Sequence, residues 1–211
     1  MKKKNIIPIL ITILSIIIII ITIKVVTKQE LLIDNIAYNL LVVKARNKYL
    51  TPFMKLMTEL SNTKTIIAIA VLLTLIIKNK RISLTIPANL IYIAFINQVL
   101  KFIFHRPRPV GYRLINIGGY SFPSGHAMAS TAFYGLLIYL SYRYIKNKNI
   151  KYISMSLNLF IIVFIIISRV YLGVHYFSDV LVGASISIIY LIIYIKLLNK
   201  YKILPKSQNK P

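Results

Sequence analysis

The sequence predicts an all-α fold: a polytopic membrane bundle of six transmembrane helices, with an amphipathic helix between the first and second spans. Composition and the length of the apolar runs support this. Of the 211 residues, 57% are hydrophobic and only 15% are charged. Apolar runs recur at roughly the 20 residues that a helix needs to cross a bilayer core. We therefore expect residues 1–211 to form a single membrane-embedded domain rather than a soluble globule.

Charge and cysteine content exclude several classes of protein. The formal net charge of +23 would suit nucleic-acid binding, and the chain has no cysteine. Most lysines and arginines, however, stand at the ends of apolar runs, where membrane topology places them. We expect no nucleic-acid partner. Without cysteine there can be no disulfide, no thiolate nucleophile and no cysteine-ligated metal.

The first span is expected at residues 6–23, after three lysines at residues 2–4. This run is longer than the apolar region of a signal peptide, and no small-residue cleavage site follows it. It is therefore predicted to be a retained transmembrane helix.

Residues 28–62 are more polar and are predicted to form amphipathic helix on the membrane surface or across the end of the bundle. Apolar residues recur there at helical spacing, at Leu32, Ile36, Leu40 and Val43. The segment also carries three of the four acidic residues, which we expect to be solvated: Glu30, Asp34 and Glu59.

The five remaining spans follow in order. They are expected at residues 65–77 (lengthened by residues before Ser61), 82–104, 124–142, 152–172 and 177–198. Proline and glycine make residues 105–123 a loop. The basic tail, residues 199–211, is predicted to be disordered.

Charge also predicts the orientation. With six spans both termini lie on one side, and that side holds more than half of the 27 basic residues and none of the four acids. The positive-inside rule then places the termini in the cytoplasm. The polar blocks within residues 101–179 would face outward, in the plasma membrane of what we expect to be a bacterium.

Three polar blocks stand out between the apolar runs, and the last contains His175 and Asp179. Four residues apart on a helix, they share a face about 6 Å apart along its axis. The carboxylate can fix one imidazole tautomer and leave the other nitrogen nucleophilic. A satisfied core histidine is the alternative. A metal site would need more ligands than His126 and His105 can add.

The other two blocks add cations and a helix start. Lys101, Arg108 and Arg169 stand at the outer ends of spans, where they suit a phosphoryl group better than lipid snorkelling. Phe-Pro-Ser-Gly-His opens a helix at Ser124 and Gly125, whose free N–H groups favour anions. His126 then stands where it can give a proton to a leaving oxygen.

Together the blocks resemble the type-2 phosphatidic acid phosphatase superfamily, which also includes vanadate haloperoxidases. The matching patterns are Lys-x6-Arg-Pro, Pro-Ser-Gly-His and Ser-Arg-x5-His-x3-Asp. The resemblance implies that His175 is phosphorylated, that Asp179 orients it and that His126 protonates the leaving group. It also implies that the phosphoryl group is held by Lys101, Arg108, Ser124, Gly125 and Arg169. His105 and Arg106 are expected beside the site without a catalytic role.

The expected activity is hydrolysis of a lipid phosphate or diphosphate monoester at the outer membrane face, with no metal or other cofactor. Undecaprenyl diphosphate, phosphatidylglycerol phosphate and phosphatidic acid all remain open as substrates, the first favoured by family analogy alone. The alternatives are a non-catalytic protein that binds or transports lipid phosphates, and a vanadate-dependent haloperoxidase. The sequence does not indicate an oligomeric state.

Overall fold

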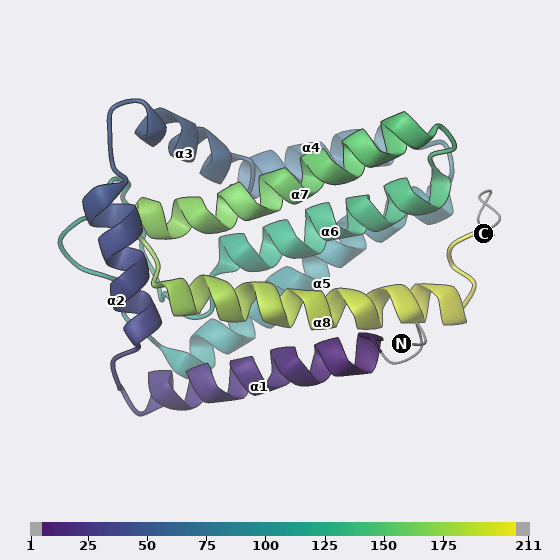
Figure 1. Ribbon diagram of the computed structural model, residues 1–211. Coiled ribbons are helices and arrows are strands. Elements are labelled where there is room, and N and C mark those ends of the chain that lie inside the picture. Colours follow the sequence, from purple (N-terminus) through teal and green to yellow (C-terminus); the bar gives the residue numbers. More distant parts are fainter. Residues whose placement is uncertain (1–5, 206–211) are drawn as a thin grey trace.

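The computed structural model describes residues 6–205, and every regular element in that range is helical. In chain order the elements are α1 (Ile6–Val26), α2 (Leu32–Tyr38), the π-helix η2 (Asn39–Lys44), α3 (Leu50–Glu59), α4 (Thr63–Ile76), α5 (Lys80–Phe104), α6 (Gly125–Tyr144), α7 (Lys148–Tyr171) and α8 (Phe177–Lys200). The long helices lie side by side, and α2 lies across one end of the bundle (Figure 1). The predicted all-α class is confirmed.

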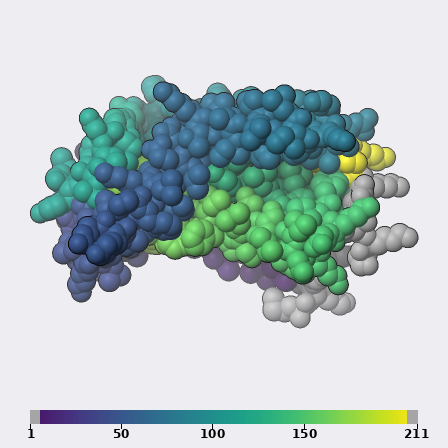
Figure 2. Space-filling model, turned by 90° about the horizontal axis from the view of Figure 1, so that it is seen from above, coloured from purple at the N-terminus to yellow at the C-terminus, as the bar shows by residue number. Residues whose placement is uncertain are grey.

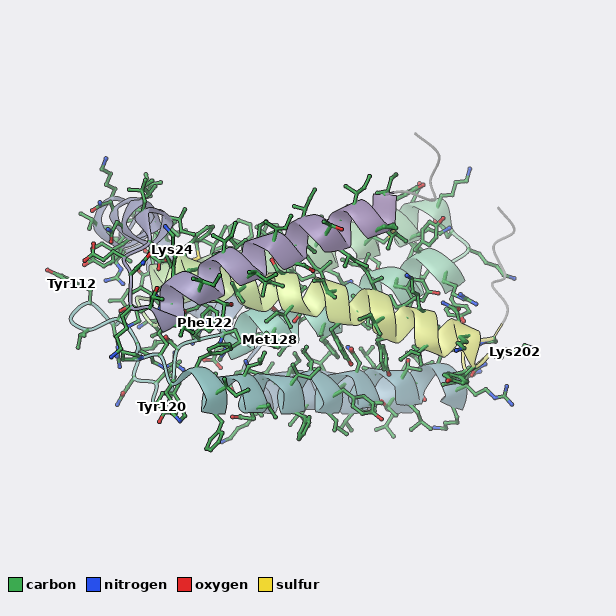
Figure 3. The ribbon with its side chains drawn as sticks, turned by 90° about the horizontal axis from the view of Figure 1, so that it is seen from below. Lys24, Tyr112, Tyr120, Phe122, Met128 and Lys202 are labelled. Carbon is green, nitrogen blue, oxygen red and sulfur yellow. The ribbon has the colours of Figure 1, made fainter. Side chains whose placement is uncertain are left out.

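The central helix is α6, which packs against α5, α7 and α8. Its buried side chains include Phe133 and Leu136, and Met128, which is labelled in Figure 3, is fully buried near its start. Because protein covers so much of this helix, it can carry Ser, Thr and Gly where a lipid-facing helix would carry Ile or Leu.

Length and apolar composition qualify four described helices to cross a membrane: α1, α5, α7 and α8. A fifth candidate is the pair α3 and α4, which is bent by 56° at its break. The helix at the fourth predicted span (residues 124–142), α6, is not among the candidates, because its sequence matches a buried position in the bundle rather than a lipid-facing one. The structure therefore gives four or five candidate spans and does not confirm the count of six.

Residues 28–62 form short helices, as predicted, and α2 packs against the start of α8. The prediction of a disordered tail from residue 199 is wrong for residues 199–205. Helix α8 continues to Lys200, Leu204 is buried, and the Pro205 carbonyl accepts hydrogen bonds from Arg143 and Tyr144. Residues 206–211 of the predicted tail lie outside the described residues.

The two ends of the bundle differ. Tyr112 and Tyr120, in the loop after α5, lie at one end, and Lys202 lies at the other (Figure 3). The space-filling view shows that loop and the α2 segment gathered at the same end (Figure 2). The ends of α5 and α7 and the starts of α6 and α8 meet there, which brings the three polar blocks together.

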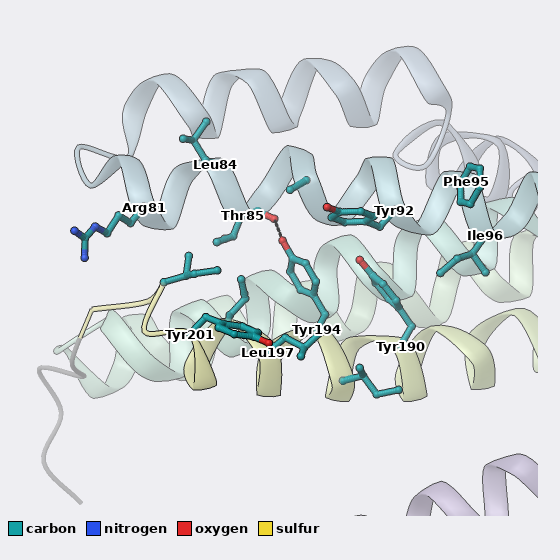
Figure 4. A pocket seen from close by; sticks show the side chains of 14 residues that line it. Arg81, Leu84, Thr85, Tyr92, Phe95, Ile96, Tyr190, Tyr194, Leu197 and Tyr201 are labelled. Atoms are coloured by element: carbon teal, nitrogen blue, oxygen red, sulfur yellow. Dashed lines mark hydrogen bonds between the residues drawn. The ribbon is translucent and has the colours of Figure 1, made fainter.

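An apolar groove of about 640 Å³ lies between α5 and α8, away from that end. Its lining includes Arg81, Leu84, Tyr92 and Phe95. Tyr194 also lines the groove, and its hydroxyl donates to the Thr85 carbonyl at 2.8 Å (Figure 4). The groove holds none of the predicted site residues.

Candidate active site

Helix ends position most of the predicted site residues. Lys101 lies in the last turn of α5 and Arg169 in the last turn of α7. Ser124 is the N-cap of α6, and its N–H donates to the Asp179 carbonyl oxygen at 3.1 Å. This bond ties the start of α6, which carries His126, to the start of α8.

A cavity of about 430 Å³ opens where these ends meet. Five of the predicted residues line it: Lys101, Arg108, Gly125, His126 and His175. The cavity continues between α4 and α5 along apolar side chains such as Ile67, Ile91 and Ala94. With a polar end and an apolar extension, the cavity is complementary to a lipid that has a charged headgroup.

His175 has both ring nitrogens in contact with a partner. Its Nδ1 lies 3.2 Å from Asp179 Oδ2, and its Nε2 lies 3.0 Å from Arg108 Nη1. A carboxylate only accepts and a guanidinium only donates, so the tautomer that fits carries its proton on Nδ1. The lone pair of Nε2 then lies on the side of the cavity, where it accepts from Arg108 Nη1, and this hydrogen bond must break before Nε2 can act as a nucleophile.

Burial, followed by the positive charges of Arg169, Arg108 and Lys101, holds the pKa of His175 well below its ordinary value. His175 is only 3% exposed, in the short connection between α7 and α8. The imidazole therefore stays neutral at physiological pH, which is the nucleophilic form.

Arg169 is fully buried, yet two of its guanidinium nitrogens lack a partner. Its Nη1 donates to Thr58 Oγ1 on α3, whereas Nε and Nη2 have no hydrogen-bond partner among the described residues. A buried cation with unpaired N–H groups is costly unless an anion completes it. These donors are the strongest structural indication of an anion site.

Arg108 is fixed by backbone carbonyls. Its Nε donates to the carbonyls of Gly118 and Gly119 at 3.1 and 3.0 Å, and its Nη1 to that of Val174 at 2.9 Å. Such a held guanidinium can present N–H groups to a phosphoryl oxygen without reorganising.

Gly125 and Ser124, the remaining predicted phosphate contacts, are placed differently from each other. A Cβ at Gly125 would stand 2.8 Å from Asn97 Oδ1, so only glycine fits there without displacing Asn97. Ser124 is fully buried, and its hydroxyl oxygen accepts from the Ala127 N–H at 3.5 Å as a helix cap. It does not line the cavity.

The expectation that Asp34 is solvated is wrong. Asp34 is 8% exposed and accepts from the backbone and hydroxyl of Ser178, both at 2.7 Å, and from Arg106 Nη2 at 3.1 Å. Arg106 also reaches Asp179 Oδ1 at 2.6 Å. Glu30 and Glu59, by contrast, are exposed.

Sequence reasoning missed Asp34 and Thr58 as neighbours of the site. It expected Arg106 beside the site, but not the contact of Arg106 with Asp179. The only signal for Asp34 was that it is a charged residue near apolar segments. Within residues 6–205 no three His, Asp or Glu side chains stand close enough to hold a metal ion.

Comparison with known proteins agrees with this geometry. Residues 83–203 match the family model of the PAP2 superfamily. Phosphatidylglycerophosphatase B of Bacillus subtilis (strain 168) is 38% identical over 98 residues, which span 44% of this chain and 47% of that protein. The match therefore covers less than half of that relative's length.

Two solved structures have a similar fold. A transmembrane PAP2-type phosphatidylglycerolphosphate phosphatase from Bacillus subtilis superposes with a TM-score of 0.77 at 24% identity, covering 90% of this chain and 96% of that one. The structure of Aquifex aeolicus LpxE gives a TM-score of 0.63 at 25% identity, covering 75% and 92%. The family match over most of the bundle, with all three polar blocks within or beside it, confirms the resemblance seen in the sequence: the chain belongs to the PAP2 superfamily.

Proposed function

We propose that this chain is a metal-independent lipid phosphatase that hydrolyses a phosphate or diphosphate monoester of a membrane lipid. The observation that carries the proposal is the buried Arg169 guanidinium with two unpaired nitrogens, near a nucleophilically oriented histidine. The apolar continuation of the cavity supports a lipid substrate. So does the name of the Bacillus subtilis relative.

In the first step Nε2 of His175 attacks phosphorus and the bond to the leaving oxygen breaks. His126, on the same cavity, enters this step as the imidazolium that the bound phosphoryl anion favours, and it donates its proton to that oxygen. Asp179 stabilises the positive charge on the imidazole through the Nδ1–H bond. Lys101, Arg108 and Arg169, with the α6 start at Ser124 and Gly125, hold the charged oxygens.

In the second step water attacks the phosphohistidine. His126, now neutral, takes the proton of the water, and the N–P bond breaks to release inorganic phosphate. This returns both histidines to their starting states, so the cycle consumes one water and needs no cofactor.

The residues proposed to hold the charged oxygens recognise the phosphoryl group and not the rest of the lipid. Undecaprenyl diphosphate, phosphatidylglycerol phosphate and phosphatidic acid all present a terminal phosphate that fits these residues. The relative named phosphatidylglycerophosphatase B makes phosphatidylglycerol phosphate the first substrate to compare with undecaprenyl diphosphate.

We assign six crossings, made by α6 together with the five candidate spans, with both termini in the cytoplasm and the site on the outer face of a bacterial plasma membrane. Helix α1 begins and α8 ends at the same end of the bundle, which an even number of crossings requires (Figure 1). The excess of basic residues at that end supports the orientation.

The test is release of phosphate from the three lipids by purified protein in detergent, with and without excess EDTA. We expect turnover of at least one lipid, unchanged by EDTA, and competitive inhibition by vanadate. Activity lost in EDTA and restored by Mg²⁺ would overturn the metal-independent mechanism. Tight binding of lipid phosphates without hydrolysis would favour a binding or transport protein.

A further inference from the structure

Arg106 bridges two carboxylates that come from opposite ends of the chain. Its Nη1 donates to Asp179 Oδ1 at 2.6 Å, and its Nη2 donates to Asp34 Oδ2 at 3.1 Å. The guanidinium carbon lies 4.0 Å from the ring centroid of Tyr176, which covers one face of it. With 15% of its side chain exposed, Arg106 is held on several sides at once.

Asp34 is itself held in place by the start of α8. Ser178 donates to it twice, from the backbone N–H to Oδ1 and from the hydroxyl to Oδ2, both at 2.7 Å. The same hydroxyl accepts from Arg106 Nη1 at 2.8 Å. Ala37, one turn further along α2, packs with Val180 of α8. Helix α2 is thereby docked on the helix that carries Asp179.

Arg106 does not line the cavity, and its guanidinium reaches the site residues through Asp179. One carboxylate oxygen of Asp179 receives Arg106, and the other faces His175 Nδ1 and receives the Tyr176 N–H at 3.0 Å. Donors on both oxygens stop the carboxylate from rotating. Arg106 also supplies a counter-charge to a carboxylate with no exposed surface.

We propose that Arg106 and Asp34 are positioning residues for the phosphatase reaction. Asp34 holds Arg106, Arg106 fixes the Asp179 carboxylate, and Asp179 orients His175. The inference rests on the proposed function and gives α2 a specific role in it: the surface helix completes the support of the nucleophile from outside the phosphate cavity.

The decisive measurement is the effect of Arg106→Met in two backgrounds, wild type and Asp179→Asn. In wild type we expect kcat to fall about 10- to 100-fold, the usual loss for residues that orient a ligand or base, with KM changed by less than about twofold. In Asp179→Asn, which has already lost the oriented carboxylate, the same substitution should change kcat by less than about threefold.

Further variants separate positioning from general damage to the fold. Arg106→Lys keeps the charge and should recover part of kcat. Asp34→Asn should lower kcat less than Arg106→Met, because it loosens Arg106 without removing it. Ser178→Ala is a milder variant that removes one hydroxyl from the network and should lower kcat several-fold even if Arg106→Met folds poorly.

Arg113 and Glu30 provide matched controls. Arg113 is an exposed arginine of the same loop that donates to the backbone carbonyls of Pro109 and Arg108, and Glu30 is an exposed acid just before α2. Arg113→Met and Glu30→Gln should leave kcat within about twofold of wild type.

The outcomes are distinct. A wild-type protein without phosphatase activity overturns the proposed function and the positioning role together. If the wild type is active but Arg106→Met lowers kcat by the same factor in both backgrounds, only the positioning role is overturned. Equal factors would mean that the effect of Arg106 on kcat does not depend on Asp179. A rise in KM with kcat unchanged would place Arg106 on the substrate instead and would equally overturn it.

Discussion

At the residue scale, the site depends on which hydrogen-bonding groups are satisfied by the protein and which are left for a ligand. Asp179 has partners on both oxygens, and Arg108 is held by three carbonyls. Arg169 is the exception, because two of its buried nitrogens have no hydrogen-bond partner within residues 6–205. This combination fits the proposed role of Arg169 in binding a phosphoryl anion.

The first prediction concerns the nucleophile. His175→Ala should lower phosphate release by at least about 1,000-fold, because no neighbouring side chain can form the covalent intermediate. The protein should still elute as a single species in detergent. His105→Ala is the control: His105 is exposed and contacts the rings of Phe102 and Tyr120. Activity within tenfold of wild type in His175→Ala would remove His175 from the role.

The second prediction concerns protonation of His175. Its pKa is held below the ordinary value, so the neutral ring persists at lower pH than in an exposed histidine, and protonation is complete only in more acidic solution. The chain has three histidines. A double variant, His105→Gln with His126→Gln, leaves His175 as the only one. NMR titration of ¹⁵N-labelled imidazole should then give a midpoint below about 6.5, the ordinary histidine value. A midpoint at or above that value would contradict the electrostatic description.

At the element scale, the short helices α2 and α3 contact residues of the site. Helix α2 brings Asp34 to Ser178 and Arg106, and α3 brings Thr58 to Arg169. Ser61, between α3 and α4, donates to the His126 carbonyl at 3.1 Å. These contacts reach the start of α8, Arg169 and the start of α6, so the segment supports the site as well as covering the end of the bundle.

The third prediction tests α3. Thr58→Val keeps the shape of the side chain and removes the acceptor of Arg169 Nη1. The substitution leaves Nη1, a third nitrogen of the fully buried Arg169 guanidinium, without its hydrogen-bond partner. We expect a loss of about 1–3 kcal/mol in stability and a higher KM, since Arg169 loses orientation. Thermal unfolding in detergent and lipid-phosphate kinetics measure the two effects. Thr65→Val, on α4, is the control, and an equal effect there would show that Thr58 has no special role.

At the scale of the whole molecule, all three polar blocks meet at the end of the bundle where α2 lies, opposite the start of α1 and the end of α8 (Figure 1). The predicted site residues thus lie at one end of the bundle. An outward site could receive lipid carriers after their cargo has been delivered and would release phosphate outside the cytoplasm.

The fourth prediction tests which side of the membrane the site faces. Because the chain has no cysteine, single cysteines can be introduced without background labelling. Val110, in the loop after α5, is 88% exposed, and Asn149 lies exposed at the start of α7, at the opposite end. A membrane-impermeant thiol reagent applied to intact cells should label Val110→Cys and miss Asn149→Cys. The reverse pattern would invert the topology. Both should be labelled after the cells are opened.

The sequence by itself determined the features that depend on local spacing. Apolar runs of spanning length predicted the all-α bundle, and four-residue spacing predicted the contact between His175 and Asp179. His175 lies just before α8 and not on it, so the two do not share a helix face as expected. They meet because Asp179, in the first turn of α8, turns its side chain back toward the helix start, where it also accepts from the Tyr176 N–H. Likewise, Pro-Ser-Gly-His marked the start of α6 through its capping residue. These outcomes need only the geometry of one helix or the thickness of a bilayer.

Only the tertiary structure decided which distant residues complete the site. Asp34 meets Ser178 across 144 positions, and Arg169 meets Thr58 across 111. Nothing in the spacing of α2 distinguishes Asp34 from the exposed Glu30, because burial depends on how α2 docks on α8. The same holds for α6, whose modest apolarity reflects its central position. Contacts between separate helices are set by packing across the bundle, and a single sequence does not display that packing.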